Sequence, residues 1–261
     1  MTDSNDSKAL SRQRYSQFAA GYVTSQGHAK GYDLDRLLEL AGPQAGWSVL
    51  DVATGGGHTA LKFAPHVAHV VASDLTPEML EQAAAFITGQ GITNAEFKLA
   101  DAENLPFENA AFDLVTCRIA PHHFPEAHRF VAEAARVLKP GGLLLVQDHV
   151  IPDDADAAQY VENFERQRDP SHHRAFTEAE WRAMFAQAGL TVTHTEQITK
   201  RHNFIDWAKR QGNSPELIAQ LESLLRDAPP AAAAWLETEN LGTPDASFVN
   251  HHLIIAGTKA G

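Results

Sequence analysis

Residues 49–58, with the sequence VLDVATGGGH, decide the fold of this chain. They form an apolar run, a turn with three consecutive glycines and the start of a helix. Because glycine has no Cβ, the turn at Gly55–Gly57 can bend sharply and bring its backbone close to a bound molecule. The stretch therefore predicts a strand–turn–helix unit that holds a ligand. The turn alone does not exclude a nicotinamide enzyme, because those enzymes use a similar one.

Apolar runs flanked by turn residues alternate with helix-period stretches from about Trp47 onward. This alternation predicts βαβ units and a parallel sheet. Thr76 is the expected N-cap of a helix that starts at Pro77, and the sequence LKPGG at 138–142 is expected to stop a later one. We expect strands at Ser48–Ala53, Val67–Asp74, Ala95–Leu99, Phe112–Arg118 and Leu143–Asp148, and helices at His58–Phe63, Pro77–Gln90 and Pro125–Leu138.

Segments outside this core look mostly helical. Residues 8–46 place Tyr15, Phe18 and Tyr22 on one apolar face, and a capping-box sequence predicts a helix over Thr177–Ala188. Further strands are expected at 191–198 and near 248–258, with a helical insertion between them. The tracts 150–175 and 200–245 can form either a substrate cover or simple scaffold. We expect one domain over 1–261, with an N-terminal helical cover (8–46), a cofactor-binding core (47–148) and a C-terminal half carrying the insertions (149–261).

The composition excludes several classes of protein. The chain has 261 residues, 44% of them hydrophobic and 21% charged, which is typical of a globular protein with a sizeable core. No apolar run approaches the ~18 residues that cross a bilayer. The formal net charge of -12 argues against nonspecific binding to nucleic acid or anionic lipid. The single Cys117 cannot form an internal disulfide, and the N-terminus is polar, so we expect a cytoplasmic protein without a membrane span.

Two acidic sites follow later strands of the core. Asp74 ends the second strand, where a carboxylate can accept hydrogen bonds from the ribose hydroxyls of an adenine nucleoside. Asp101 and Ala102 follow the third strand and offer a side-chain acceptor and a backbone donor to an adenine edge. Counted from Gly55, Ala60 stands at the third glycine of G-x-G-x-x-G, and no phosphate-binding lysine motif is present. These features favour a nucleoside cofactor over a dinucleotide.

The glycine turn, the acids, the strand FDLVTCR at 112–118 and the LKPGG sequence occur in the same order in one known family. Residues 47–148 resemble the class I S-adenosylmethionine-dependent methyltransferases, most closely the methyltransferase type 11 branch with the ubiquinone/menaquinone-biosynthesis methyltransferases. The resemblance implies an α/β, Rossmann-like, seven-stranded and mostly parallel sheet. Its last strand is antiparallel, helices cover both faces, and helical insertions form lids. It also implies S-adenosylmethionine as cofactor and a small-molecule methyl acceptor.

The same resemblance assigns roles to individual residues. The glycine turn and Asp51 line the methionine part of the cofactor, and Asp74 holds its ribose. Leu75 and Met79 pack on the adenine, whose edge Asp101 and Ala102 read, and Arg118 presents its backbone carbonyl near the methionine amine. Ala53 stands where a glycine is common. The candidate cofactor-binding residues are Asp51, Ala53, Thr54, Gly55, Gly56, Gly57, Asp74, Leu75, Met79, Asp101, Ala102, Glu103, Arg118 and His123.

Methyl transfer to a hydroxyl or an acidic carbon also needs a base, and histidine is the commonest one. Among the 14 histidines, His122 and His123 follow the fourth strand and His149 follows the fifth. Because neighbours on an extended chain point in opposite directions, His122 and His123 are not expected to face the pocket together. His123 is our first candidate for the catalytic base and His149 the second. No recognised ligand spacing indicates a metal site.

Three functions remain open from the sequence. The first is a methyltransferase that acts at O, N or C of a small molecule. The second is an NAD(P)-dependent oxidoreductase, which shares the glycine turn and the ribose acid, although no Tyr-x-x-x-Lys pair is present. The third is a non-catalytic S-adenosylmethionine-binding protein. The ligand is expected over the carboxyl ends of the first and fourth strands, where the strand order of an open sheet reverses.

Overall fold

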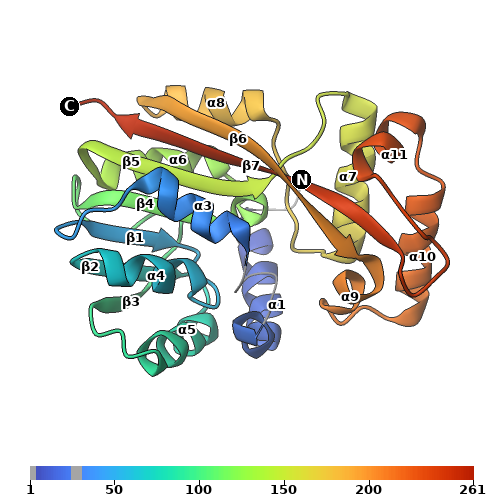
Figure 1. The fold of residues 1–261 in the computed structure, drawn as a ribbon, viewed down its shortest axis with the longest axis horizontal. Helices are drawn as coiled ribbons and strands as arrows, with labels where there is room; N and C mark the ends of the chain where they lie inside the picture. The colour runs from blue at the N-terminus through green and yellow to red at the C-terminus, as the bar shows by residue number, and fades with distance from the viewer. Residues whose placement is uncertain (1–3, 25–30) are drawn as a thin grey trace.

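The computed structural model describes residues 4–24 and 31–261, and the side chains of residues 6–16 and 31–261 within them. Seven strands form one sheet in the order β3-β2-β1-β4-β5-β7-β6, and β7 is antiparallel to both of its neighbours (Figure 1). This arrangement confirms the expected α/β fold, including the reversal of strand order between β1 and β4. The strands are β1 Ser48–Val52, β2 His69–Asp74, β3 Ala95–Leu99, β4 Phe112–Arg118, β5 Leu138–His149, β6 Leu190–Asn203 and β7 Ser247–Lys259.

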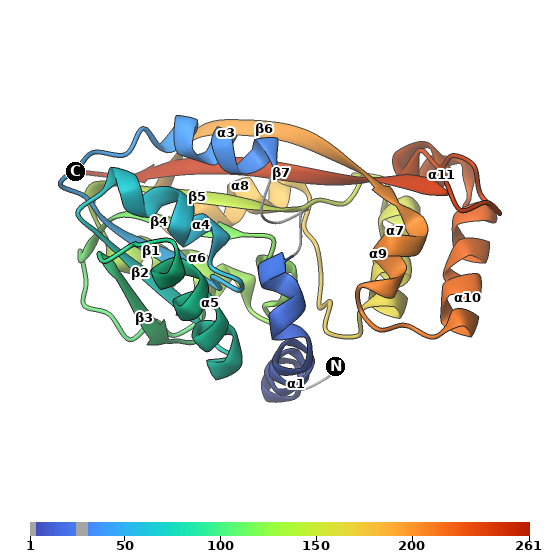
Figure 2. The ribbon, with the colours of Figure 1, turned by 60° about the horizontal axis from the view of Figure 1, so that its bottom comes forward.

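Helices cover both faces of the sheet, as Figures 1 and 2 show together. The side chains of Phe18 and Tyr22 lie outside the described residues. None of the described helices is long and apolar enough to cross a membrane. The helices are α1 Ser4–Thr24, α3 Tyr32–Ala41, α4 His58–Phe63, α5 Pro77–Gly89, α6 Ala127–Val137, α7 Ala155–Arg168, α8 Glu178–Gln187, α9 Phe204–Lys209, α10 Pro215–Arg226 and α11 Pro230–Leu236, with 3-10 turns at Ala64–His66 and Pro121–His123.

Side chains alternate between the two faces of the sheet along each strand, so neighbouring residues of a strand pack into different apolar clusters. On β1, Val49 points into an apolar cluster with α3, α4 and α5, whereas Leu50 points into a second cluster with α6 and α8. Leu114 and Val115 divide in the same way on β4. The central strands are therefore buried on both sides, as expected for parallel strands.

A separate lobe surrounds the far ends of β6 and β7 (Figure 1). It consists of α7, α9, α10 and α11, and its apolar core includes Phe164, Phe204, Trp207 and Phe248. The strand expected at 191–198 continues to Asn203, which pairs with Ser247. The expected end was wrong because residues 199–203 are mostly polar, and pairing with β7 stabilises this segment without an apolar pattern.

Other helix and strand boundaries differ from the expected ones because of local hydrogen bonds. The LKPGG segment, expected to precede β5, belongs to it, because Leu138 already pairs with Phe112. The second strand starts at His69 because a 3-10 turn occupies 64–66. Thr76 is the N-cap of α5 but makes no side-chain cap bond. The capping box at Thr177 and Glu180 is present as expected. The division into 8–46, 47–148 and 149–261 stays a prediction.

Candidate functional site

The glycine turn between β1 and α4 has an unusual backbone. Ala53, Gly55 and Gly57 all have positive φ values, of 53°, 53° and 83°. Glycine adopts this region without cost, whereas Ala53 stores strain of about 1–2 kcal/mol. A Cβ on Gly57 would lie 2.9 Å from Ile87 Cδ1 of α5. Gly57 therefore closes the turn against α5, whereas Gly55 and Gly56 line a cavity beside the turn.

Asp51 holds the turn from inside the protein. Its carboxylate accepts hydrogen bonds from Thr54 Oγ1 at 2.6 Å, Thr116 Oγ1 at 2.7 Å and the backbone N–H of Ala60 at 3.2 Å. Burial raises the pKa of Asp51 to about 6, although these hydrogen bonds oppose the shift. Asp51 does not line the cavity, so in this structure its carboxylate contacts the turn rather than the open space.

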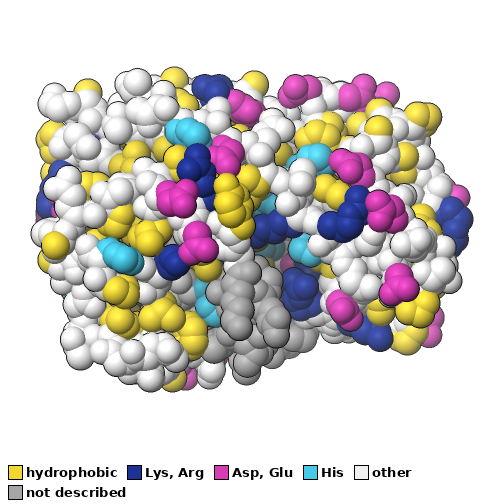
Figure 3. Space-filling model, viewed as in Figure 1, with side chains coloured by type: hydrophobic (Ala, Val, Ile, Leu, Met, Phe, Trp, Pro, Cys, Tyr) yellow, Lys and Arg dark blue, Asp and Glu magenta, His cyan; other side chains and the backbone are white. Residues whose placement is uncertain are grey.

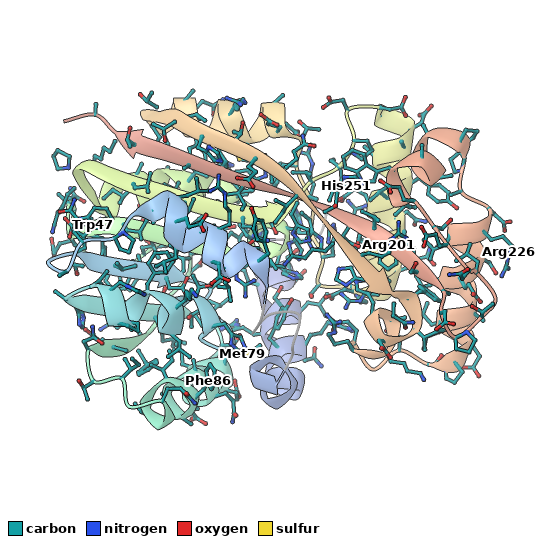
Figure 4. All side chains as sticks on the ribbon, viewed as in Figure 1. Trp47, Met79, Phe86, Arg201, Arg226 and His251 are labelled. Carbon is teal, nitrogen blue, oxygen red and sulfur yellow. The ribbon has the colours of Figure 1, made fainter. Side chains whose placement is uncertain are left out.

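The first cavity lies at the carboxyl ends of β1, β2 and β4. Figure 4 shows Met79 on this side of the sheet and Trp47 at the opposite end. Of the predicted cofactor-binding residues, only Asp51 and Gly57 are not among its lining residues. The ones that do line it are Ala53, Thr54, Gly55, Gly56, Asp74, Leu75, Met79, Asp101, Ala102, Glu103, Arg118 and His123.

Carboxylates dominate the charge of the first cavity. Asp74 accepts the backbone N–H groups of Gly55 and Thr76, both at 2.9 Å, and burial raises its pKa. Asp101 and Glu103 lie on the far side of the cavity, where Lys8 Nζ contacts them at 2.7 Å and 2.5 Å. The cavity thus offers acids to a cationic or hydroxyl-bearing ligand, and its lysine is already paired.

The side chain of Arg118, which lines the first cavity, contacts buried residues of the protein interior. Its guanidinium forms a buried ion pair with Asp33 at 2.8 Å and donates to Thr59 Oγ1 at 3.2 Å. The resemblance to the methyltransferases implies a role only for its backbone carbonyl. Lys200 Nζ contacts the same oxygen of Asp33 at 2.7 Å, so one carboxylate serves two cations.

Helix α1 covers the first cavity through Lys8, Ser11 and Tyr15. Tyr15 Oη lies 2.5 Å from His123 Nε2, and His123 Nδ1 lies 2.9 Å from the backbone oxygen of Ser171. A carbonyl oxygen only accepts, so Nδ1 carries the proton and Nε2 accepts from the Tyr15 hydroxyl. Burial lowers the pKa of His123, and the nearby Asp169 carboxylate opposes that shift. His123 is therefore a neutral imidazole poised to take a proton from Tyr15.

A second cavity adjoins the first and shares Tyr15 and Ile119 with it. Ile119 follows β4 with φ of 54°, a strained value for a β-branched residue. Such strain clusters at functional sites. The second cavity lies between the sheet and the lobe, where Figure 3 shows Lys, Arg and His side chains gathered. It is lined by Tyr15, Ile119, His122, His149, Arg168, Asp169, Lys200, His202, Trp207, Arg210, Gln211, Asn250 and His252.

His149, the second candidate base, lines this second cavity and not the first. Its ring stacks on His122 at 4.5 Å, and burial lowers its pKa well below the usual value, as do the neighbouring histidines His122 and His172. His122 and His123 line different cavities, but they lie in the 3-10 turn 121–123 and not on an extended chain. The expected separation holds, and the reason given for it was wrong.

The buried pair behind these rings is His122 and Asp148, with Nδ1 and Oδ1 2.6 Å apart. Burial raises the pKa of Asp148 to about 7 and lowers that of His122 well below its usual value. The described residues contain no group of three or more His, Cys, Asp or Glu side chains arranged to hold a metal ion.

Sequence reasoning missed the contacts made by distant segments. It left the insertions as cover or scaffold, and they line the second cavity through Arg168, Lys200 and Trp207. It placed Tyr15 on an apolar face, and no motif links that residue to His123, 108 positions later. Only the repeated Tyr and Phe spacing in the N-terminal segment gave a signal that it packs on the core.

Comparisons with known proteins agree with this architecture. Residues 50–146 match a family model described as a methyltransferase domain. The uncharacterized methyltransferase YcgJ of Bacillus subtilis is 35% identical over 246 residues, covering 94% of this chain and 97% of YcgJ. The crystal structure of YcgJ superposes with a TM-score of 0.84 at 34% identity, covering 88% of this chain and 99% of that one.

A second relative matches over a shorter part of the chain. The ubiquinone/menaquinone biosynthesis C-methyltransferase UbiE of Pseudomonas putida is 39% identical over 119 residues, which is 44% of this chain and 46% of that protein. The match to YcgJ covers 94% of the chain and therefore includes most of its C-terminal half.

Proposed function

The chain belongs to the class I methyltransferases, and we propose that it transfers a methyl group from S-adenosylmethionine in the first cavity to a small molecule in the second. The observation that carries this proposal is the meeting of the two cavities at Tyr15 and Ile119. One cavity is lined by the glycine turn and strand-end acids, and the other by imidazoles and cations. A donor and an acceptor held in them would face each other across this junction.

The residues of the first cavity fit the proposed cofactor. Asp74 presents a buried carboxylate to a ribose, and Asp101 and Ala102 line the cavity and are expected to meet the adenine edge. The lysine and arginine that line this cavity are each paired with a carboxylate, and the further acids of the cavity would repel the diphosphate of a dinucleotide. Neither the oxidoreductase nor the non-catalytic binding protein is favoured by the family match.

Tyr15 and His123 would supply the acid–base chemistry. When bound, S-adenosylmethionine provides a methyl group activated by its sulfonium sulfur. An O–H, N–H or acidic C–H acceptor loses its proton to the Tyr15 oxygen, while the Tyr15 proton passes to His123 Nε2. The imidazolium formed there keeps its hydrogen bond to Ser171 and faces the Asp169 carboxylate. His149 is the second candidate base, because burial and the neighbouring histidines lower its pKa well below the usual value.

The role of α1 follows from the same contacts. Lys8 occupies the acids expected to meet the adenine, and Tyr15 closes the junction. Cofactor entry therefore requires Lys8 to release Asp101 and Glu103, and closure of α1 then brings Tyr15 back to His123. Closing the site excludes water from the reacting groups.

Mass spectrometry of small molecules released from the purified full chain tests the cofactor assignment. We expect S-adenosylmethionine or S-adenosylhomocysteine, and titration calorimetry should show saturable binding of both. Recovery of NAD(H) would overturn the proposal. Incubation with a panel of small-molecule acceptors should then yield S-adenosylhomocysteine in step with methylated product.

A further inference from the structure

The second cavity is positively charged in an acidic protein. Three cationic side chains line it, Arg168, Lys200 and Arg210, against one carboxylate, Asp169. The chain as a whole carries a formal net charge of -12. A local excess of cations inside such a chain attracts small anions and opposes binding of small cations.

The single carboxylate in the cavity is already engaged. Asp169 accepts hydrogen bonds from the backbone N–H of Ser171 at 2.9 Å and from Gln211 Nε2 at 2.8 Å, and Arg14 lies 3.3 Å away. Arg14 and Arg168 both act on this one carboxylate, so Asp169 cannot neutralise all of the cations beside it.

Lys200 also retains excess charge. Its partner Asp33 is shared with Arg118, so the buried group of three carries one net positive charge. Arg118 lies at the first cavity and Lys200 at the second, and Asp33 lies between them. An anion in the second cavity would complete the neutralisation of this group.

Arg168 is held in place by a ring. Its guanidinium carbon lies 4.4 Å from the centre of the Trp207 ring, and Nη2 donates to the Trp207 backbone oxygen at 3.2 Å. Its buried Nε has no hydrogen-bond partner, and Arg168 forms no ion pair with any described residue. A preorganised guanidinium with a free donor is suited to a carboxylate or phosphate oxygen.

Buried polar atoms at the cavity also lack protein partners. His252 is 1% exposed and Asn250 6% exposed, and neither the two ring nitrogens of His252 nor Asn250 Oδ1 has a hydrogen-bond partner among the described residues. Native proteins pair nearly all such atoms, so unpaired ones at a cavity wall point to a bound polar molecule. Burial, followed by the cations Arg210, Lys200 and Arg168, lowers the pKa of His202 to about 4, in line with a positive local potential.

We propose that the methyl acceptor is a small organic anion, and that Lys200 and Arg168 bind its carboxylate or phosphate group in the second cavity. This inference rests on the proposed function, because it assigns that cavity to the acceptor. The anionic group lies toward Lys200 and Arg168, and the methyl-accepting atom lies toward Tyr15 and Ile119. His252 and Asn250 supply the remaining hydrogen bonds.

Titration calorimetry on the full chain at constant ionic strength tests this site with two probes, inorganic phosphate and benzoate. Saturable binding of phosphate alone would assign a phosphate group, of benzoate alone a carboxylate, and of both the shared anionic chemistry. Lys200→Gln and Arg168→Gln should each weaken binding about ten-fold or more, because each removes a charge-assisted hydrogen bond. Arg168→Lys keeps the positive charge and should recover part of the lost affinity. Such a recovery would show that the loss in Arg168→Gln comes from the missing charge and not from altered packing on Trp207.

Lys209→Gln is the matched control. Lys209 is an exposed cation of the same lobe that does not line the cavity, so its loss should leave binding unchanged. Binding of neither probe, or equal losses in the Lys209 and Lys200 variants, would overturn the anionic site.

The two proposals fail separately. Affinity for S-adenosylmethionine, measured on the same samples, should be unchanged in Lys209→Gln and in Arg168→Gln. If the wild-type protein binds phosphate or benzoate but not S-adenosylmethionine, the proposed function fails and the anion site stands. If it binds S-adenosylmethionine and methylates only cationic or neutral acceptors, the anion site fails alone.

Discussion

The two cavities differ in how the chain builds them. The first is lined mainly by short segments at strand ends, such as 53–56 after β1, 74–76 after β2 and 100–103 after β3. The second is lined by single residues from many segments, including Tyr15, His149, Lys200 and His252. The first uses a strained turn and carboxylates, whereas the second uses imidazoles and cations. The difference indicates that the proposed cofactor site is a local feature of a parallel sheet, whereas the proposed acceptor site is assembled by tertiary packing.

The junction between the cavities gives the largest expected effect. Tyr15→Phe removes the hydroxyl that contacts His123 and keeps the ring of a residue that lines both cavities. Turnover should fall by about 100-fold or more, because a positioned acid–base group contributes at least that much. Affinity for S-adenosylmethionine should stay within a few-fold of the wild-type value.

Tyr160→Phe is the control for this change, since the Tyr160 hydroxyl donates to the Leu224 backbone at 2.7 Å and lies at neither cavity. Equal turnover in the two variants would show that the Tyr15 hydroxyl takes no part in proton transfer. It would also show that the two cavities do not act together through this hydroxyl.

The buried acid behind the glycine turn titrates in a defined range. The pKa of Asp51 is raised by burial from 3.8 to about 6, so the folded state holds more protons than the unfolded state between these values. The wild-type free energy of unfolding, relative to Asp51→Asn, should therefore fall as pH rises from about 4 to about 6, by up to about 3 kcal/mol. Urea unfolding across this range measures the difference.

A free-energy difference between the wild type and Asp51→Asn that stays constant from about pH 4 to about pH 6 would mean that the turn is not anchored by a buried carboxylate.

The ribose acid tests the first cavity directly. Asp74→Ala should weaken binding of S-adenosylmethionine by about ten- to a hundred-fold, since a hydrogen bond to a charged group is worth ~1.5–3 kcal/mol. Calorimetry measures the affinity. Asp113→Ala is matched to it, because Asp113 also accepts a backbone N–H, from Ser48 at 2.8 Å, but starts β4 at the far end of the sheet. Asp113→Ala should lower stability without changing affinity, and similar affinities in both variants would place the cofactor elsewhere.

Replacing either of two adjacent histidines of β7 should give the smallest effect. The two changes should alter the free energy of unfolding in opposite directions. His252→Leu removes two buried ring nitrogens that have no partner among the described residues, so the free energy of unfolding should rise by ~1 kcal/mol. His251→Leu removes a hydrogen bond from Nε2 to the Trp235 backbone at 2.8 Å and should lower it. Thermal and urea unfolding would show the contrast.

The KM for the acceptor should rise in the His252 variant, because His252 is proposed to hydrogen-bond the acceptor. A residue kept for binding can cost stability, so the gain in stability should come with a loss of binding. Equal destabilisation by both changes would indicate that His252 is an ordinary packing residue.

Most of the sheet was predictable, because periodicity and turn chemistry act over a few residues. β3 and β4 end where the sequence indicated, as does α4. The missed boundaries were those set by pairing with distant segments, such as the extension of β6 to Asn203 along β7. The same division applies to the site. All of the proposed cofactor-binding residues except Asp51 and Gly57 line the first cavity, whereas Thr76, Ala100 and Ala120 line it without having been proposed.

The sequence by itself determined the order of strand-end motifs, and with it the cavity at the reversal between β1 and β4. That information is local, because the glycine turn and the strand-end acids are fixed by hydrogen bonds within one βα unit or between adjacent strands. Only the tertiary structure decided that Tyr15 meets His123, that Asp33 joins Arg118 to Lys200, and that cations line the second cavity. Those contacts join residues more than 80 positions apart. They depend on how α1, the lobe and the long β6–β7 pair pack, and no short sequence pattern encodes that packing.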